Sequence, residues 1–127
     1  MMSPLRTLGA LCLLLGSLAA CSHNERPPCY LVSGKQAKAM LAPGTILLDV
    51  RTREQQSTGR VRESIHVPVS ELSYRMKYLS LDTRIVVFGQ TQRQARDAAV
   101  LLRRSGYEVF ELGPIADLRS DDPKCEL

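Results

Sequence analysis

The chain has 127 residues, of which 44% are hydrophobic and 24% charged, so its composition is that of an ordinary globular protein and not of a disordered or collagen-like chain. Its 17 basic residues exceed its 13 acidic residues by four and form no run of like charge, which argues against nucleic acid as a partner. The length accommodates a single domain.

Residues 1–20 predict an export signal that is not part of the fold. A basic start is followed by an apolar stretch from Leu8 to Leu15, too short to span a bilayer stably, and then by small residues. The segment Leu18-Ala19-Ala20-Cys21 resembles the lipobox of bacterial lipoproteins, in which the cysteine is acylated and becomes the first mature residue. This resemblance implies lipidation of Cys21. The alternative is an ordinary signal peptide whose removal leaves Cys21 unmodified.

Residues 21–28 are polar and contain two prolines, and we interpret them as a tether to a domain that spans 29–127. The expected partner is the lipid bilayer, bound through acylated Cys21. The seven residues after Cys21 reach about 25 Å at most, so the domain is expected to lie close to the membrane. The domain is expected in the cell envelope, facing the periplasm. By resemblance to Gram-negative lipoproteins, Ser22 in place of aspartate favours the outer membrane over the inner one.

Two cysteines remain in the predicted domain, Cys29 near its start and Cys125 near its end. They show neither a C-x-x-C pair nor metal-ligand spacing, so we expect no metal site and no cofactor. Disulfides persist outside the cytoplasm. Export therefore predicts a disulfide between Cys29 and Cys125.

Apolar runs alternate with helical patterns along the domain. Residues 30–32 predict a short first strand, and Ser33 is the expected N-cap of a helix that Pro43-Gly44 ends. Residues 46–50, interrupted by Asp49, and 85–88 form apolar runs. Continuous apolar strands are typical of a parallel sheet covered on both faces.

Two further helices and a last strand follow from the same patterns. Ser70 is the expected N-cap of a helix that turns Leu72, Met76 and Leu79 inward. The clearest helical period, at i, i+3, i+4 and i+7, is that of Ala95, Ala98, Ala99 and Leu102. Gly106 stands where a C-cap glycine belongs, and a strand is predicted over 107–112. This alternation implies a three-layer α/β/α domain with a mainly parallel central sheet.

Several segments, in this order, resemble the rhodanese-like family. Residues 46–52, Ile-Leu-Leu-Asp-Val-Arg-Thr, are similar to the family's strand that ends in Asp-Val-Arg. The other segments that match in spacing are 59–61, 65–68, 70–72, 85–88, 106–107 and 112–115. The resemblance covers about residues 30–118, and the single-domain periplasmic members of the phage-shock type are the most similar. It implies a rhodanese-like fold.

In that family a strand delivers a cysteine into a tight loop, whose backbone N–H groups and following helix N-terminus converge on the sulfur. Such a cradle lowers the pKa of a thiol and stabilises a persulfide or a bound oxyanion. The resemblance places Gly89 at the position of this cysteine. Covalent sulfur transfer needs a thiolate, which glycine lacks, so we predict no catalytic residue and a silent domain.

The candidate binding residues surround this loop: Gly89, Gln90, Thr91, Gln92, Arg93, Gln94, Asp49 and Arg51. Thr91 is expected to cap the next helix, because no histidine nearby can serve as its base. Asp49 is expected to hold loop amides rather than to act as a general base. Arg93 either pairs with an anion or is solvated. Five arginines either converge at the mouth of the loop or form a solvated rim: Arg51, Arg53, Arg60, Arg62 and Arg93.

Further departures from the family pattern agree with the loss of chemistry: Arg60 replaces a histidine, Glu63-Ser64 replaces Gly-Ala, and Gln92 replaces a loop glycine. His66 is expected to be an outward strand residue rather than a metal ligand. We therefore expect a membrane-anchored, non-catalytic rhodanese-like lipoprotein that binds a small oxyanion or a protein. The alternatives are a thiosulfate or persulfide sulfurtransferase and a structural envelope protein with an idle pocket.

Overall fold

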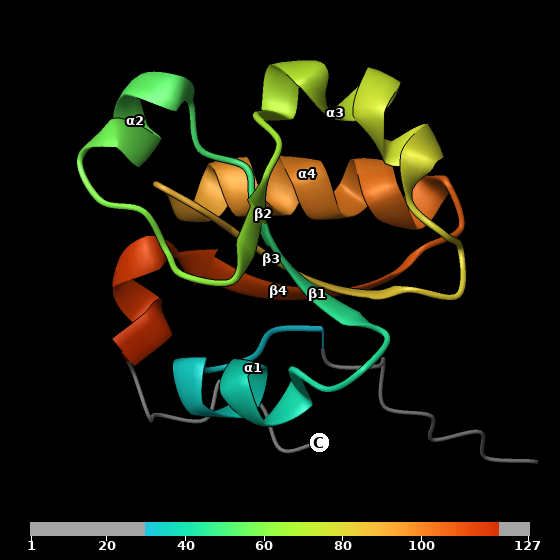
Figure 1. Ribbon diagram of the computed structural model, residues 1–127, viewed down its shortest axis with the longest axis horizontal. Coiled ribbons are helices and arrows are strands. Elements are labelled where there is room, and N and C mark those ends of the chain that lie inside the picture. Colours follow the sequence, from blue (N-terminus) through green and yellow to red (C-terminus); the bar gives the residue numbers. More distant parts are fainter. Residues whose placement is uncertain (1–29, 120–127) are drawn as a thin grey trace, which may run out of the picture.

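The computed structural model of the protein describes residues 30–119, and it is a three-layer α/β fold (Figure 1). Its elements follow in the order α1 (Gly34–Met40), β1 (Thr45–Asp49), α2 (Arg53–Ser57), β2 (Ser64–His66), α3 (Val69–Arg75), the 3₁₀ helix η1 (Met76–Tyr78), β3 (Arg84–Gly89), α4 (Gln92–Arg104), β4 (Glu108–Pro114) and the 3₁₀ helix η2 (Ile115–Arg119). The strands form one parallel sheet in the order β2-β1-β3-β4. The predicted fold class is confirmed.

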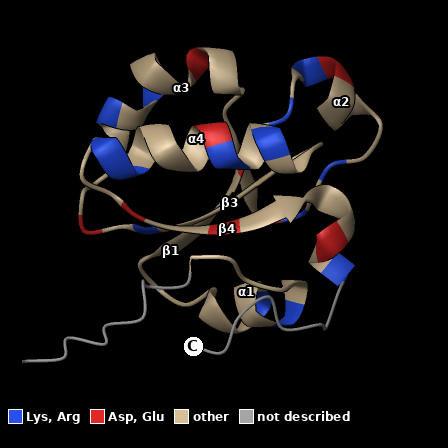
Figure 2. Cartoon of the chain, turned by 180° about the vertical axis from the view of Figure 1, so that it is seen from behind, with Lys and Arg blue, Asp and Glu red and all other residues tan. Residues whose placement is uncertain are grey.

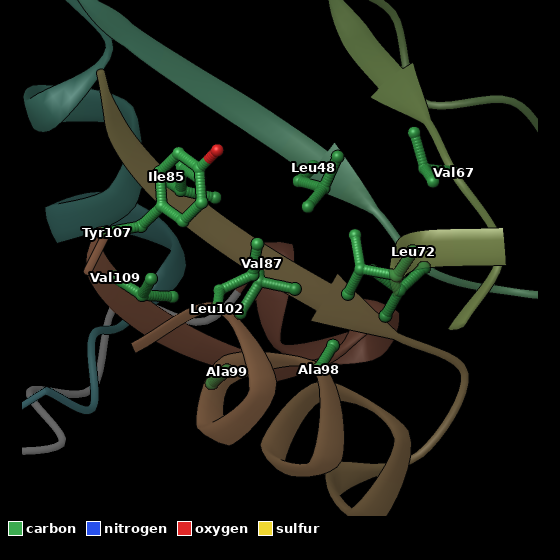
Figure 3. Packing of buried hydrophobic residues seen from close by; sticks show 11 residues of the cluster. Leu48, Val67, Leu72, Ile85, Val87, Ala98, Ala99, Leu102, Tyr107 and Val109 are labelled. Carbon is green, nitrogen blue, oxygen red and sulfur yellow. The ribbon is translucent and has the colours of Figure 1, made fainter. Parts of the chain in front are cut away.

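The sheet is covered on both faces, and this explains the continuous apolar runs in the sequence. Neighbouring residues of a strand point to opposite faces. Leu48 and Val87 pack on the side of α3 and α4 (Figure 3), whereas Leu47 and Val86 pack on the side of α1 and η2. The two central strands, β1 and β3, therefore have apolar residues at consecutive positions.

The two helix starts predicted from capping residues at 33 and 91 are confirmed. The Ser33 hydroxyl accepts a hydrogen bond from the Gln36 N–H at 3.2 Å, and Gln36 Oε1 accepts one from the Ser33 N–H at 2.8 Å. Thr91 caps α4, since its hydroxyl accepts from the Gln94 N–H at 3.2 Å. The four apolar residues that predicted α4 are all fully buried. Gly106, with φ +93°, follows the C-cap of α4.

Three local predictions were wrong or incomplete. Residues 30–32 form no strand; Leu31 makes a single bridge to Glu111. Ser70 does not cap a helix, because α3 already begins at Val69. The residue before it, Pro68, is the N-cap, and its φ of −52° suits the start of a helix. The helix α2 was not predicted, although Thr52 and Gln55 form its capping box.

Within residues 30–119, no helix is long and apolar enough to cross a membrane. The predicted signal segment 1–20, the tether 21–28, the lipidation site Cys21 and the cysteines Cys29 and Cys125 lie outside the described residues.

Candidate functional site

The loop between β3 and α4 lies at the carboxyl end of the parallel sheet, where ligand sites of such sheets are usually found. Gly89 ends β3 and is buried, whereas Gln90 and Thr91 are exposed. The neighbouring strand β1 ends beside it at Asp49, which is in register with Phe88. The site is therefore built from the ends of two adjacent strands and the first turn of α4.

The side chain of Gln94 closes this loop from inside. Its Oε1 accepts a hydrogen bond from the backbone N–H of Gln90 at 2.8 Å. Its Nε2 donates to Oε1 of Gln55 at 3.0 Å, and the same Gln55 oxygen accepts from the Thr52 N–H at 3.0 Å. Gln94 thus ties the loop to the start of α2, and one N–H of the predicted cradle already has a partner.

The space at Gly89 is also restricted. A Cβ atom built on Gly89 would lie 2.8 Å from Cβ of Gln94, 3.1 Å from the backbone nitrogen of Ala95 and 3.2 Å from Oε1 of Gln94. The first distance is shorter than real carbon contacts, and Cβ is the part of Gln94 nearest to the helix backbone. Any side chain at position 89 therefore requires α4 or the loop to move.

Gln92 fixes the other side of the loop to β4. Its Nε2 donates to the carboxylate of Glu111, which is 4% exposed and lies 3.8 Å from Nε of Arg96. A Cβ on Gly113 would lie 2.4 Å from Oε1 of Gln92, so glycine at 113 leaves the room that the Gln92 side chain fills. The two glutamines therefore anchor the loop on opposite sides.

Asp49 and Arg51 form a buried ion pair behind the loop. Nη2 and Nε of Arg51 donate to the two carboxylate oxygens at 2.7 and 2.9 Å, and both residues are at most 1% exposed. The remaining Arg51 donors reach the backbone oxygens of Gln55 at 3.3 Å and Gly59 at 2.8 Å. Oδ1 of Asp49 also accepts from the Arg51 N–H at 3.1 Å. This pair holds the segment after β1 in place, and at 1% exposure the Arg51 guanidinium is not accessible to a ligand.

The five arginines considered from the sequence do not gather at the mouth of the loop. Arg51 is buried, Arg53 pairs with Glu71 at 2.9 Å, and Arg93, 91% exposed, lies 3.8 Å from Asp97. Hydrogen bonding from Arg53 is the main reason why the pKa of Glu71 is lowered. Arg60 and Arg62 belong to a separate groove.

His66 lies at the end of β2, half-buried, with Nε2 at 2.8 Å from the backbone oxygen of Arg51. In the described part of the chain, no group of histidine, cysteine and acidic residues is arranged to hold a metal ion. None of the four cysteines, at positions 12, 21, 29 and 125, falls within residues 30–119.

The role of Gln94 was missed from the sequence, although its spacing carried a signal. Thr91 followed three residues later by a glutamine is the pattern of a capping box, in which the glutamine would accept from the N–H of the cap residue. Here Thr91 does cap α4, but the Gln94 oxygen reaches one residue further back, to Gln90. That displacement brings it into the loop.

Comparison with known proteins identifies the family of this fold. The sequence pattern of the rhodanese-like domain matches residues 33–113. A search of curated proteins found no relative. Among solved structures, the reduced CoADR-RHD of Bacillus anthracis has a TM-score of 0.63 and 26% identity over 71% of this chain, which spans only 16% of that longer protein.

Two shorter solved structures match over most of their own length. A rhodanese-related protein of Thermoplasma volcanium has a TM-score of 0.62 and 22% identity, over 72% of this chain and 90% of its own. The Alr3790 protein of Anabaena sp. has a TM-score of 0.59 and 26% identity, over 72% of this chain and 85% of its own. With the family pattern matching most of the chain, this protein belongs to the rhodanese-like domain family.

Proposed function

We propose that this protein is a lipid-anchored rhodanese-like domain of the cell envelope that transfers no sulfur and serves as a binding module for a protein partner. The family resemblance leads us to expect a reactive cysteine at position 89, but the residue there is Gly89, and this supports the proposal. A glycine offers no group that accepts or carries a sulfur atom.

The observation that carries the proposal is the contact between Gly89 and Gln94. If only the thiol were missing, an empty cradle would remain for an anion. Instead, Gln94 approaches a hypothetical Cβ at position 89 to 2.8 Å, and its oxygen already accepts from the Gln90 N–H. A small oxyanion would have to displace this side chain to reach the Gln90 N–H. This favours a protein partner, bound elsewhere on the domain, over an anion bound in the loop.

The sulfurtransferase alternative would need a nucleophile from another part of the protein. Thr91 is engaged as the N-cap of α4, and residues 30–119 include no cysteine. No observation in the described residues therefore favours this alternative.

Exposure of the purified mature chain to thiosulfate, followed by mass spectrometry of the intact protein, tests the proposal. We expect no added sulfur atom, and no thiocyanate when cyanide is then supplied. A rhodanese that retains its cysteine serves as the positive control for both readouts. A stable sulfur adduct on the chain, or thiocyanate formation at the rate of that control, would contradict the proposal.

A further inference from the structure

Most arginines of the described chain already have a carboxylate partner. Within residues 30–119, ion pairs of up to 3.8 Å engage Arg51, Arg53, Arg75, Arg84, Arg93 and Arg96. Arg103 instead donates to the backbone oxygen of Val109 and lies over the ring of Tyr30 at 4.2 Å. In that part of the chain, the arginines with neither kind of partner are Arg60, Arg62, Arg104 and Arg119.

Three of these four arginines line one groove. A cavity of about 340 Å³ lies between the segment after α2 and the helix η2, and its walls include Arg60, Arg62 and Arg119. Figure 2 shows the basic positions of these two segments on the same side of the molecule. Because guanidinium groups repel one another, an anionic partner would lower the energy of this arrangement.

The groove is elongated rather than round. A second cavity of about 300 Å³ shares Arg60 and Arg62 with the first and continues to Ser64. A third, of about 240 Å³, shares Glu63 with the second and includes Ile65, but it is otherwise lined by residues 41–47. The first two cavities therefore follow the chain from residue 59 to 64, a length that suits an extended peptide better than a small ion. The Glu63 carboxylate in the second cavity confines the carboxylates of such a peptide to the end lined by Arg60, Arg62 and Arg119.

Apolar side chains lie between the charges. Val61, Ile115 and Leu118 line the first cavity and pack only partly into the core behind it. At the far end, Ile65 is 44% exposed. A ligand for this groove would combine carboxylates with apolar side chains, because arginine binds carboxylates through paired hydrogen bonds and the floor is apolar.

The groove also ends at an open edge of the sheet. The strand β2 is the first in the order β2-β1-β3-β4 and pairs only with β1 among the described strands. Exposed strand edges accept extended peptides as an additional strand. Ser64, at the start of β2, lines the second cavity, so a peptide in the groove would lie next to this edge.

We infer that this groove binds an extended, acidic segment of a partner protein, with carboxylates on Arg60, Arg62 and Arg119 and an apolar side chain against Val61, Ile115 and Leu118. The inference rests on the proposed function and names the surface that performs it. It does not involve the loop of residues 89–94, so sulfur transfer by that loop and peptide binding by the groove are tested separately.

The test uses the full mature chain carrying Cys21→Ala, which prevents lipidation, and a short fluorescein-labelled peptide in which aspartate and leucine alternate. Binding is measured by fluorescence anisotropy at about 0.15 M salt, which screens long-range electrostatic attraction between the peptide and the protein. We expect the double variant Arg60→Ala/Arg62→Ala to raise the dissociation constant on the order of tenfold. Arg104→Ala is the control and is compared with Arg60→Ala alone, because each removes one unpaired and exposed arginine and Arg104 lies outside the groove; it should leave the constant unchanged. Circular dichroism verifies that the variants are folded.

A second peptide, with alanine in place of each leucine, should bind more weakly if the apolar floor contributes. Absence of binding by the first peptide, or an equal loss of affinity with Arg104→Ala, would overturn the inference.

The acidic residues Asp121 and Asp122 follow Arg119 in the same chain. If Asp121→Asn/Asp122→Asn strengthened peptide binding about tenfold, the occupant would be this segment and the proposed partner would be wrong. If the peptide does not bind and the protein transfers no sulfur, the proposal that the domain is non-catalytic stands, and only the proposal that the groove binds a peptide is rejected.

Discussion

The side-chain oxygen of Gln94 lies 2.8 Å from the backbone nitrogen of Gln90 and accepts its hydrogen bond. In loops of this kind, converging N–H groups stabilise a negative charge. Here a neutral carboxamide from the first turn of α4 takes one of these donors, and its other end is held by Gln55. The Gln90 N–H is therefore occupied without an anion, and the loop is connected to the neighbouring helix α2.

A cysteine introduced at position 89 alone should not provide a reactive thiol. We expect Gly89→Cys to be less stable than the wild type, because its Cβ would lie 2.8 Å from Cβ of Gln94. The double variant Gly89→Cys/Gln94→Gly removes that contact and frees the Gln90 N–H. Its thiol should have a pKa below the ordinary value of about 8.5, because it faces free N–H groups and a helix N-terminus.

The rate of alkylation by iodoacetamide as a function of pH measures this pKa. The native cysteines must first be blocked or shown to be oxidised, and the wild type treated in the same way is the control. A thiol of ordinary pKa in the double variant would show that the loop amides do not converge on position 89.

Loss of Asp49 should destabilise the domain strongly. Asp49→Ala leaves the Arg51 guanidinium, 1% exposed, with only backbone oxygens as partners. Removing one member of a buried pair costs about 3–5 kcal/mol, and urea unfolding measures the change. Arg53→Ala, which removes an exposed partner of Glu71, is the control and should change the free energy of unfolding little. Equal effects of the two substitutions would contradict the structural role of Asp49.

Glycine should be preferred at position 63. Glu63 has φ +67°, the left-handed conformation that side chains with a Cβ rarely adopt. We expect Glu63→Gly to be more stable than Glu63→Ala by about 1 kcal/mol, because both remove the carboxylate and only glycine removes the Cβ strain. Thermal unfolding of the two variants provides the comparison, and a more stable alanine variant would count against a left-handed conformation in solution.

The predicted Cys29–Cys125 disulfide would close a loop of about 97 residues and add at most ~4.7 kcal/mol of stability. Labelling of free thiols in the unreduced, denatured protein should modify neither cysteine. Reduction should lower the midpoint of thermal unfolding. Modification of both cysteines without reduction would exclude the bridge.

Lipidation at Cys21 predicts that the native protein fractionates with membranes and that Cys21→Ala releases it. Each buried methylene of an acyl chain contributes ~0.8 kcal/mol, so the anchor needs no apolar face on the domain. Mass spectrometry of the native N-terminus is decisive: an unmodified Cys21 as first residue would refute the anchor.

The fold could be predicted because its signals are local and repeated. The apolar runs around Leu48 and Val87, the period that buries Ala98 and Ala99, and the cap at Thr91 each point to the same layered architecture. Short elements give weaker signals in the sequence. The apolar residues around Leu31 have the pattern of a strand but form only a single bridge, and α2 lies in a polar segment without an apolar helical period.

The position of the loop between a strand and the helix of residues 95–102 could be predicted from the sequence, but the contacts within the loop could not. The importance of Gly89 was inferred from the family resemblance, whereas the contact of Gln94 with Gln90 depends on the side-chain conformation of Gln94 in the first turn of α4. Likewise, Arg51 was expected among the binding residues, and only the packed structure shows that Asp49, Gln55 and Gly59 take up its donors. The groove at Arg60 and Arg119 joins segments distant in the chain, which no local pattern indicates.

Closure of the loop by Gln94 is tested most directly by titrating sulfate into the ¹⁵N-labelled mature chain and following the amide resonance of Gln90 in the wild type and in Gln94→Ala. We predict that the Gln90 resonance moves with sulfate only in Gln94→Ala, because the substitution frees this N–H and leaves the helix N-terminus unchanged. A Gln90 resonance that titrates with the same affinity in the wild type would contradict the closed loop.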